Sequence, residues 1–209
     1  MRKALTLIEM ILTMVIVGLV FTVVPKIIFV TNRSFETVAK EDALYNALSL
    51  AGIVAELPWD ENNTKYDAIL LTQSTQAEYL CDASTGFYRV GGFKGGRNCI
   101  GSGSAAASAV GREDALFNDM DDYDGYSVTT TTPKGAKYEL NVTVRYLGEP
   151  AATSPLVDLS ALAPAAGTTN IKEISVTVTY ADSKRPFVSS VYYHSANIGQ
   201  VRIKRRAWR

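Results

Sequence analysis

The sequence is poor in the residues on which most catalytic and metal sites depend. Its 209 residues include one histidine, His194, and two cysteines, Cys81 and Cys99. A four-ligand zinc site would need nearly every soft ligand in the chain, which points away from metalloenzymes. The net charge is zero, with 21 basic and 21 acidic residues, whereas a dedicated nucleic-acid-binding protein usually carries a basic surplus. We therefore expect no cofactor, no nucleic-acid partner and no enzymatic activity.

Two motifs that would indicate catalysis or nucleotide binding are also missing. The nucleophile pattern G-x-S-x-G does not occur, and His194 has no convincing catalytic partner, so we interpret it as a surface or edge-strand histidine. The glycine-rich segment 91–96 lacks the Gly-Lys-Ser/Thr ending of a phosphate-binding loop. These absences favour an anchored structural or interaction protein.

The N-terminal part of the chain joins a short basic end to a long apolar stretch. Arg2 and Lys3 precede this stretch, which runs from Leu5 to Val30 and contains Glu9. As a helix it would reach roughly 39 Å, enough to cross a bilayer core of about 30 Å. The two cations place the N-terminus in the cytoplasm by the positive-inside rule, so we expect the bulk of the chain to be exported.

The apolar stretch lacks the features of a conventional signal peptide. No small-x-small cleavage site follows it, and no cysteine lies close by for lipidation. Glu9 needs an explanation, because an acid in mid-membrane costs on the order of 2.5–3.5 kcal/mol and usually has a partner. A plain anchor gains nothing from Glu9, whereas an assembling helix could pair it with a cation on a neighbouring chain.

These N-terminal features together resemble a known family. The basic leader ending at Ala4, the sequence Leu5-Thr-Leu-Ile-Glu9-Met and the following apolar helix with Gly18 and Pro25 are similar to the N-terminus of type IV pilins and type II secretion pseudopilins. The resemblance covers about thirty residues. In this family a prepilin peptidase cuts before the apolar stretch and methylates the new N-terminus.

The resemblance assigns a role to each matching residue. It implies a cut between Ala4 and Leu5, which leaves Leu5 as the first mature residue. Glu9 would neutralise the terminal amine of an adjoining subunit during assembly, and Gly18 would be a small position in the packing helix. The chain differs from the family in having Ala4 where glycine is usual and Leu5 where phenylalanine is usual, and its Pro25 lies one residue earlier than the usual proline.

Beyond Val30 the pattern predicts an amphipathic continuation of the helix over residues 31–57. Apolar residues recur at steps of three and four, which is typical of a helix with one buried face. We expect Phe35, Val38, Leu44, Leu48, Ala51 and Ala55 to form that face. The helix should end at Leu57, because Pro58 disfavours helical conformation in the residue before it.

The remainder, residues 58–209, is predicted to be an exported β-rich domain. Residues 139–146 and 173–180 alternate between apolar and polar, which indicates half-buried antiparallel strands. Phe187–His194 is predicted to pair with the second of these, and Val201–Ile203 to add a short edge strand. We interpret 101–108 and 148–170 as surface loops. The expected fold class is α+β, with the long helix laid on an antiparallel sheet.

The two cysteines are expected to be on the exported side. In an oxidising periplasm a disulfide between Cys81 and Cys99 is expected. The alternative is two separate buried thiols.

An acidic segment, 119–125, offers weak calcium candidates, and they are Asp119, Asp121, Asp122 and Asp124. The segment fails the EF-hand register, because position twelve is Thr131 where glutamate is needed. We favour an aspartate-rich turn opposite the basic tail, residues 202–209, and no metal. Residues 58–64, 121–126 and 193–199 also resemble minor pilins of the mannose-sensitive haemagglutinin type.

The hypothesis is a minor pilin or pseudopilin that the prepilin peptidase trims and that enters a filament through its N-terminal helix. Its partners would be other pilin subunits, the peptidase, the inner-membrane assembly platform and the inner membrane itself. It would cross the inner membrane once with its C-terminal domain in the periplasm, before joining a periplasmic or extracellular filament. The alternatives are an anchored periplasmic binding protein that does not polymerise, and DNA capture by the basic tail.

Overall fold

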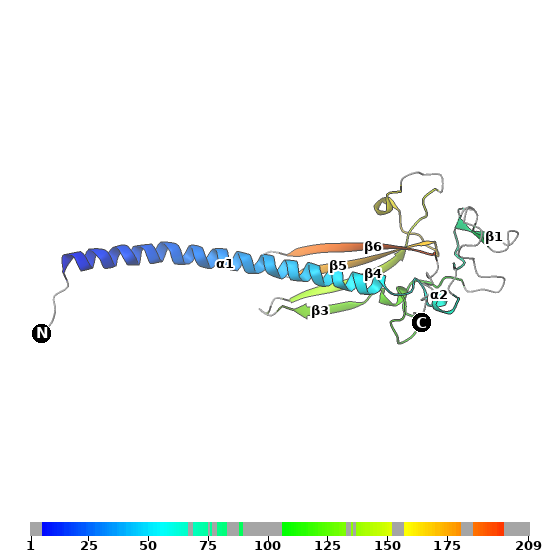
Figure 1. Ribbon diagram of the computed structural model, residues 1–209, viewed down its shortest axis with the longest axis horizontal. Helices are drawn as coiled ribbons and strands as arrows, with labels where there is room; N and C mark the ends of the chain where they lie inside the picture. Colours follow the sequence, from blue (N-terminus) through cyan, green and yellow to red (C-terminus); the bar gives the residue numbers. More distant parts are fainter. Residues whose placement is uncertain are drawn as a thin grey trace, which may run out of the picture. The chain divides into compact units, whose positions relative to one another are not determined.

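The computed structural model describes residues 6–66, 69–74, 76, 79–82, 88–89, 106–132, 135, 137–151, 157–180 and 186–198. The chain forms two compact units, Met1–Ala43 and Leu44–Arg209. Helix α1 (Leu7–Ala55) begins in the first unit and ends in the second (Figure 1).

The C-terminal end of α1 lies two residues before the predicted one. The last helical residue is Ala55, and the amides of Glu56 and Leu57 then donate to the carbonyls of Ile53 and Val54 at 3.3 and 3.1 Å. These are the tighter i to i−3 bonds of a fraying helix end. Pro58 disfavours helical conformation at Leu57, and the regular helix already ends two residues before Leu57.

A four-stranded antiparallel sheet forms the second unit together with the end of α1. Its order is β3 (Ser127–Thr131), β4 (Lys137–Tyr146), β5 (Ile171–Tyr180) and β6 (Phe187–Ala196). The strands predicted for 139–146 and 173–180 are confirmed, and so is the pairing of the third with the second. Strand β3 was not predicted. Residues 201–203 lie outside the described residues.

Short elements complete the unit. Helix α2 (Glu61–Tyr66) follows α1 directly, and the two-residue strands β1 (Cys81–Asp82) and β2 (Tyr88–Arg89) pair with each other. Two 3-10 turns, η2 (Asp121–Tyr123) and η3 (Leu159–Ala161), lie in the segments before β3 and β5. Only residues 106–108 of the predicted loop 101–108 are described. In the predicted loop 148–170, most of the described residues are at least partly exposed, but Thr169 and Asn170 are buried.

The core lies between one face of the sheet and a stripe of small residues on α1. Alternate residues of β4 and β5 are buried, and they include Leu140, Val142, Val144, Ile174, Val176 and Val178. The helix side is supplied by Ala47, Ala51 and Val54, which are at most 4% exposed, and the Asn46 amide also donates to the Tyr138 hydroxyl of β4.

The predicted buried face of α1 is therefore wrong for its large residues. Ala51 is buried as expected, but Phe35, Val38, Leu44 and Leu48 are between 41 and 56% exposed, and Ala55 is half-buried. Leucines and alanines both recur every four residues here, so the sequence pattern fits either face. The inward side of the sheet already carries bulky residues, and small helix residues allow the closer approach. The α+β fold class, a long helix packed on an antiparallel sheet, is confirmed.

Candidate functional site

The N-terminal part of α1 is an uninterrupted apolar surface. Every residue from Thr6 to Val30 is exposed in the structure, and the helix is long and apolar enough to cross a membrane, with a mean hydropathy of 2.6 in its most apolar window. None of that window is buried by the chain's own fold. A single-pass anchor of this kind is compatible with the predicted localisation at a membrane.

Glu9 lies in the first turn of α1, and its amide donates to the Thr6 carbonyl at 3.0 Å. A carboxylate is favoured in this position by the partial positive charge of the helix N-terminus. Its side chain has no partner within the part of the chain that the structure describes. Ala4 and Leu5, the predicted cleavage pair, lie outside the described residues.

The other two predicted assembly residues lie further along the same surface. A Cβ added at Gly18 would meet nothing within 4 Å, so the chain's own packing does not require glycine there. Pro25 lies inside α1, where it lacks an amide to donate to the preceding turn. The fold supplies no reason of its own for either residue.

A second apolar surface continues on the part of α1 that belongs to the sheet-containing unit. Leu44, Tyr45, Leu48 and Ile53 are 41, 69, 55 and 56% exposed. They are spread around the side of the helix that the alanine stripe leaves free, with Ile53 about half a turn round from Leu44. We call these four side chains the outer stripe.

The acidic segment forms a turn, as predicted, and most of this turn is buried. Asp119, Asp121 and Asp122 are at most 5% exposed. The Asp119 carboxylate accepts the amides of Glu61, Asp121 and Asp122 at 2.6–3.1 Å, and Asp122 accepts that of Asn118 at 2.8 Å. These bonds hold the turn η2 against the start of α2.

Asp124, the fourth calcium candidate, is exposed and accepts the amide of Val144 at 2.9 Å. No three histidine, cysteine, aspartate or glutamate side chains of the described residues are placed to hold a metal ion. The basic tail, residues 202–209, lies outside the described residues.

A buried ion pair joins this acidic segment to the sheet. Lys172, at the start of β5, is fully buried, and its Nζ donates to Asp121 Oδ2 at 2.5 Å and to the Trp59 carbonyl at 2.7 Å. Asp60 Oδ2 lies 3.9 Å from the same nitrogen. The Trp59 ring is 3.9 Å from Nζ and the Tyr146 ring 5.1 Å away. The arrangement ties the chain after α1 to η2 and to the sheet.

Burial changes the acidity of the groups in this cluster. Loss of solvation raises the pKa of Asp121 to about 7, although Lys172 opposes this change. Burial also raises the pKa of Asp119 to about 6, against the hydrogen bonds that it accepts. The pKa of the Tyr146 hydroxyl is raised above its usual range by burial and by Asp121 and Asp60. The hydroxyl therefore stays protonated and donates to the Ser108 carbonyl at 2.7 Å.

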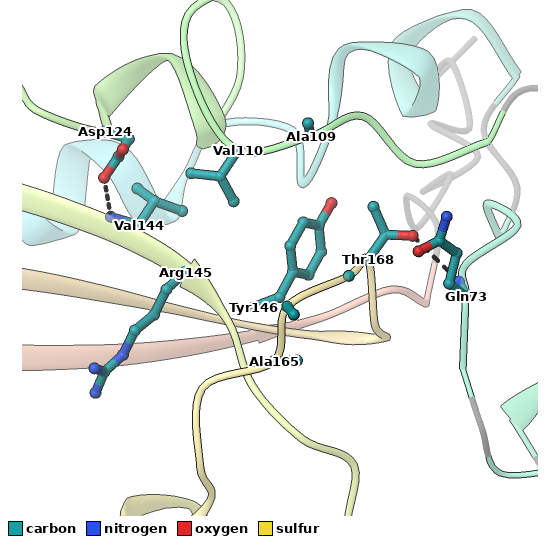
Figure 2. Close-up of a pocket in the computed structure, with 11 residues that line it drawn as sticks. Gln73, Ala109, Val110, Asp124, Val144, Arg145, Tyr146, Ala165 and Thr168 are labelled. Atoms are coloured by element: carbon teal, nitrogen blue, oxygen red, sulfur yellow. Dashed lines mark hydrogen bonds between the residues drawn. The ribbon is translucent and has the colours of Figure 1, made fainter.

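An open hollow of about 470 Å³ lies beside the strand β4 (Figure 2). Val144, Arg145 and Tyr146 line one side and residues 165–168 another. Its two charged side chains are both engaged, because Asp124 bonds to Val144 and Arg145 lies 2.6 Å from Glu173. The other lining residues are uncharged, and no histidine or cysteine is among them, so the hollow presents no pair of nucleophile and base.

His194 lies on β6, the last strand of the sheet, as predicted. Its Nε2 is 3.2 Å from Glu173 Oε2, and Glu173 also binds Arg145. Arg145, Glu173 and His194 lie opposite one another on the neighbouring strands β4, β5 and β6. Such cross-strand pairs stabilise a sheet, so we interpret His194 as a structural residue. Cys99 and the side chain of Cys81 lie outside the described residues, as does the predicted disulfide.

Sequence reasoning missed Lys172, Asp60 and Ser108 as members of one cluster. The sequence does contain an indication for Lys172. Alternate residues of a strand share one face, so Lys172 lies on the same buried face of β5 as Ile174, Val176 and Val178. The cluster joins three segments that are far apart in the sequence, and only the fold brings them together.

No protein-family model matches the sequence, and no curated protein and no solved structure is significantly similar to it.

Proposed function

We propose that this protein is a minor pilin or pseudopilin. The prepilin peptidase would cut between Ala4 and Leu5 and methylate Leu5, and the mature helix would then enter a filament of related subunits. The proposal rests first on the N-terminal resemblance. The role needs no catalysis by this chain, and its partners would be the peptidase, the inner-membrane assembly platform and other subunits.

The outer stripe is the structural observation that carries the proposal. A bilayer core of about 30 Å is already spanned by residues 7–30. Leu44 lies about 20 Å further along the helix, so a plain anchor gives no reason for exposed leucine, tyrosine and isoleucine side chains there. In a filament, helices of neighbouring subunits would cover this surface and remove it from water.

Glu9 supplies specificity to the same step. In the membrane its carboxylate is costly to hold near the apolar region. When the helix moves next to another subunit, the carboxylate gains the terminal amine of that subunit as an ionic partner. The apolar surface then drives association and Glu9 sets the axial position of one helix against the next.

The test combines two substitutions in the native host. Glu9→Gln keeps the size of the side chain and removes its charge, and Leu48→Lys places a charge on the outer stripe, where the side chain is mostly exposed. We expect both variants to stay in the membrane and to disappear from sheared filaments. Glu41→Gln, an exposed acid on the same helix, is the matched control and should assemble normally. Normal filament incorporation of both test variants would refute the proposal.

The rival function is an anchored periplasmic binding protein that does not polymerise, and the hollow beside β4 is the observation in its favour. The mass of the N-terminal peptide separates the two. A methylated Leu5 at the N-terminus supports the pilin, whereas an intact Met1 supports the anchor. DNA capture by residues 202–209 would instead give salt-dependent DNA binding that is lost when these residues are removed.

A further inference from the structure

The cluster around Lys172 holds an amine and a carboxyl group in direct contact and out of water. Lys172 Nζ and Asp121 Oδ2 are 2.5 Å apart, and the two side chains are 0 and 1% exposed. Reacting groups held this close in a fixed orientation have an effective concentration far above any in solution.

The surroundings of the pair favour its uncharged form. Asp121 Oδ1 is buried and has no hydrogen-bond partner within the described residues, which is a costly state for a carboxylate and a milder one for a carbonyl oxygen. The rings of Trp59 and Tyr146 exclude water on the lysine side. Moving one proton along the short bond from Nζ to Oδ2 gives a neutral amine beside a neutral acid.

A second acid and a hydroxyl are in place to move protons. Asp60, also fully buried, lies 3.9 Å from Nζ through its Oδ2. The Ser108 hydroxyl lies between the two acids, 2.9 Å from Asp60 Oδ2 and 3.1 Å from Asp121 Oδ2. Ser108 therefore connects the acid next to the amine with the oxygen that would leave.

We propose that Lys172 and Asp121 form an intramolecular amide bond. Nζ of the neutral lysine attacks Cγ of the protonated Asp121, which forms the C–N bond. Asp60 takes the extra proton from Nζ and returns it, through the Ser108 hydroxyl, to the hydroxyl group on Cγ. The C–O bond breaks, one water molecule leaves, and Asp60 ends as it began. No oxidant, reductant or cofactor takes part.

The bond would remove the cost of burying two charges. In the ion pair Asp121 Oδ1 is an unsatisfied carboxylate oxygen, and in the amide it becomes a neutral carbonyl oxygen. The product joins η2 covalently to the start of β5, across 51 residues of sequence. This inference concerns the sheet-containing unit and does not depend on the proposed function.

The test is a tryptic map of the full-length protein, reduced before digestion so that no disulfide contributes. Unlinked chains give separate peptides 113–134 and 146–172. Linked chains resist cleavage after Lys172 and give 113–134 joined to 146–184, at the summed mass less one water molecule. We expect the linked product. Complete cleavage after Lys172 at full peptide mass would overturn the proposal, whatever the variants do.

Three variants assign the roles. Lys172→Arg must give only unlinked peptides, because a guanidinium stays protonated and does not attack. Asp60→Asn keeps the size of the side chain but cannot carry the proton, so we expect the linked fraction to fall at least tenfold; normal linkage there would refute the role of Asp60. The matched control is Lys137→Arg on the exposed face of β4, which should remain fully linked.

Discussion

Asn197 is the side chain whose loss should reveal most about how the sheet-containing unit is held together. It lies just after β6 and is fully buried. Its Oδ1 accepts the amide of Leu70 at 3.0 Å, while its Nδ2 donates to the Leu70 carbonyl at 2.8 Å and to Asn170 Oδ1 at 2.9 Å. One side chain therefore satisfies both backbone groups of a residue 127 positions away. We predict that Asn197→Ala is strongly destabilising.

The magnitude follows from the groups left behind. Leu70 is 1% exposed, so without Asn197 its amide and carbonyl would lose the side-chain partner that the described residues supply, at a site that water does not reach. Each buried, unpaired backbone group costs about 1–3 kcal/mol, which gives a loss of about 2–6 kcal/mol in the free energy of unfolding. This is a large part of the roughly 5–15 kcal/mol that a typical domain has.

The assay is equilibrium unfolding in urea of the full chain in detergent micelles, followed by tryptophan fluorescence, since Trp59 is buried. Asn141→Ala is the matched control, because Asn141 is half-buried on β4 and faces away from the helix. It should change the free energy of unfolding by no more than about 0.5 kcal/mol. If Asn197→Ala costs less than about 1 kcal/mol, the reasoning from unpaired backbone groups is refuted.

Two further predictions concern the same unit. Burial raises the pKa of Asp119 from 3.8 to about 6, so the folded state holds the Asp119 proton more tightly than the unfolded state does. The resulting contribution to the free energy of unfolding is complete below pH 3.8 and is lost as the pH rises through 6. The loss is at most about 3 kcal/mol, and urea unfolding from pH 4 to 7 should show a weaker decline in Asp119→Asn than in the unchanged protein; an unaltered decline would contradict it. Ala47→Leu should overpack the helix–sheet contact and cost about 1–3 kcal/mol, whereas Leu48→Ala, one residue along, should cost less than about 1 kcal/mol; the reverse order in urea unfolding would show that the buried face is misassigned.

The strands were predictable from the sequence wherever one face is exposed to solvent and the other is buried. In β4 and β5 the alternation of apolar and polar residues is complete over eight positions, and it fixes both the strand and its inward face. Strand β3 lacks this contrast, since its sequence Ser-Val-Thr-Thr-Thr has Val128 as its one apolar residue and none of its residues is buried. It lies at the margin of the sheet, where only the β-branched character of its residues indicates a strand.

Local sequence patterns were not sufficient to predict the buried face of the helix or the buried cluster around Lys172. Leu44 and Leu48 repeat at the same spacing as Ala47 and Ala51, so periodicity alone does not say which set meets the sheet. For Asp121 the sequence indicated an aspartate-rich turn but not its burial, because burial of several carboxylates is rare unless they are paired. The partner, Lys172, lies 51 residues away, and no short-range pattern connects the two.

The bond between Asn197 and Leu70 also limits when this unit can reach its final state. A chain that emerges from its N-terminus, whether from a ribosome or from a membrane, presents Leu70 long before residue 197 exists on the same side. Contacts of such long range are slow to form, since a large loop must close before any stabilisation is gained. Until the last strand arrives, the polar backbone of Leu70 remains open to water or to other proteins. We therefore expect folding of this unit to be completed only after the C-terminal end of the chain is available.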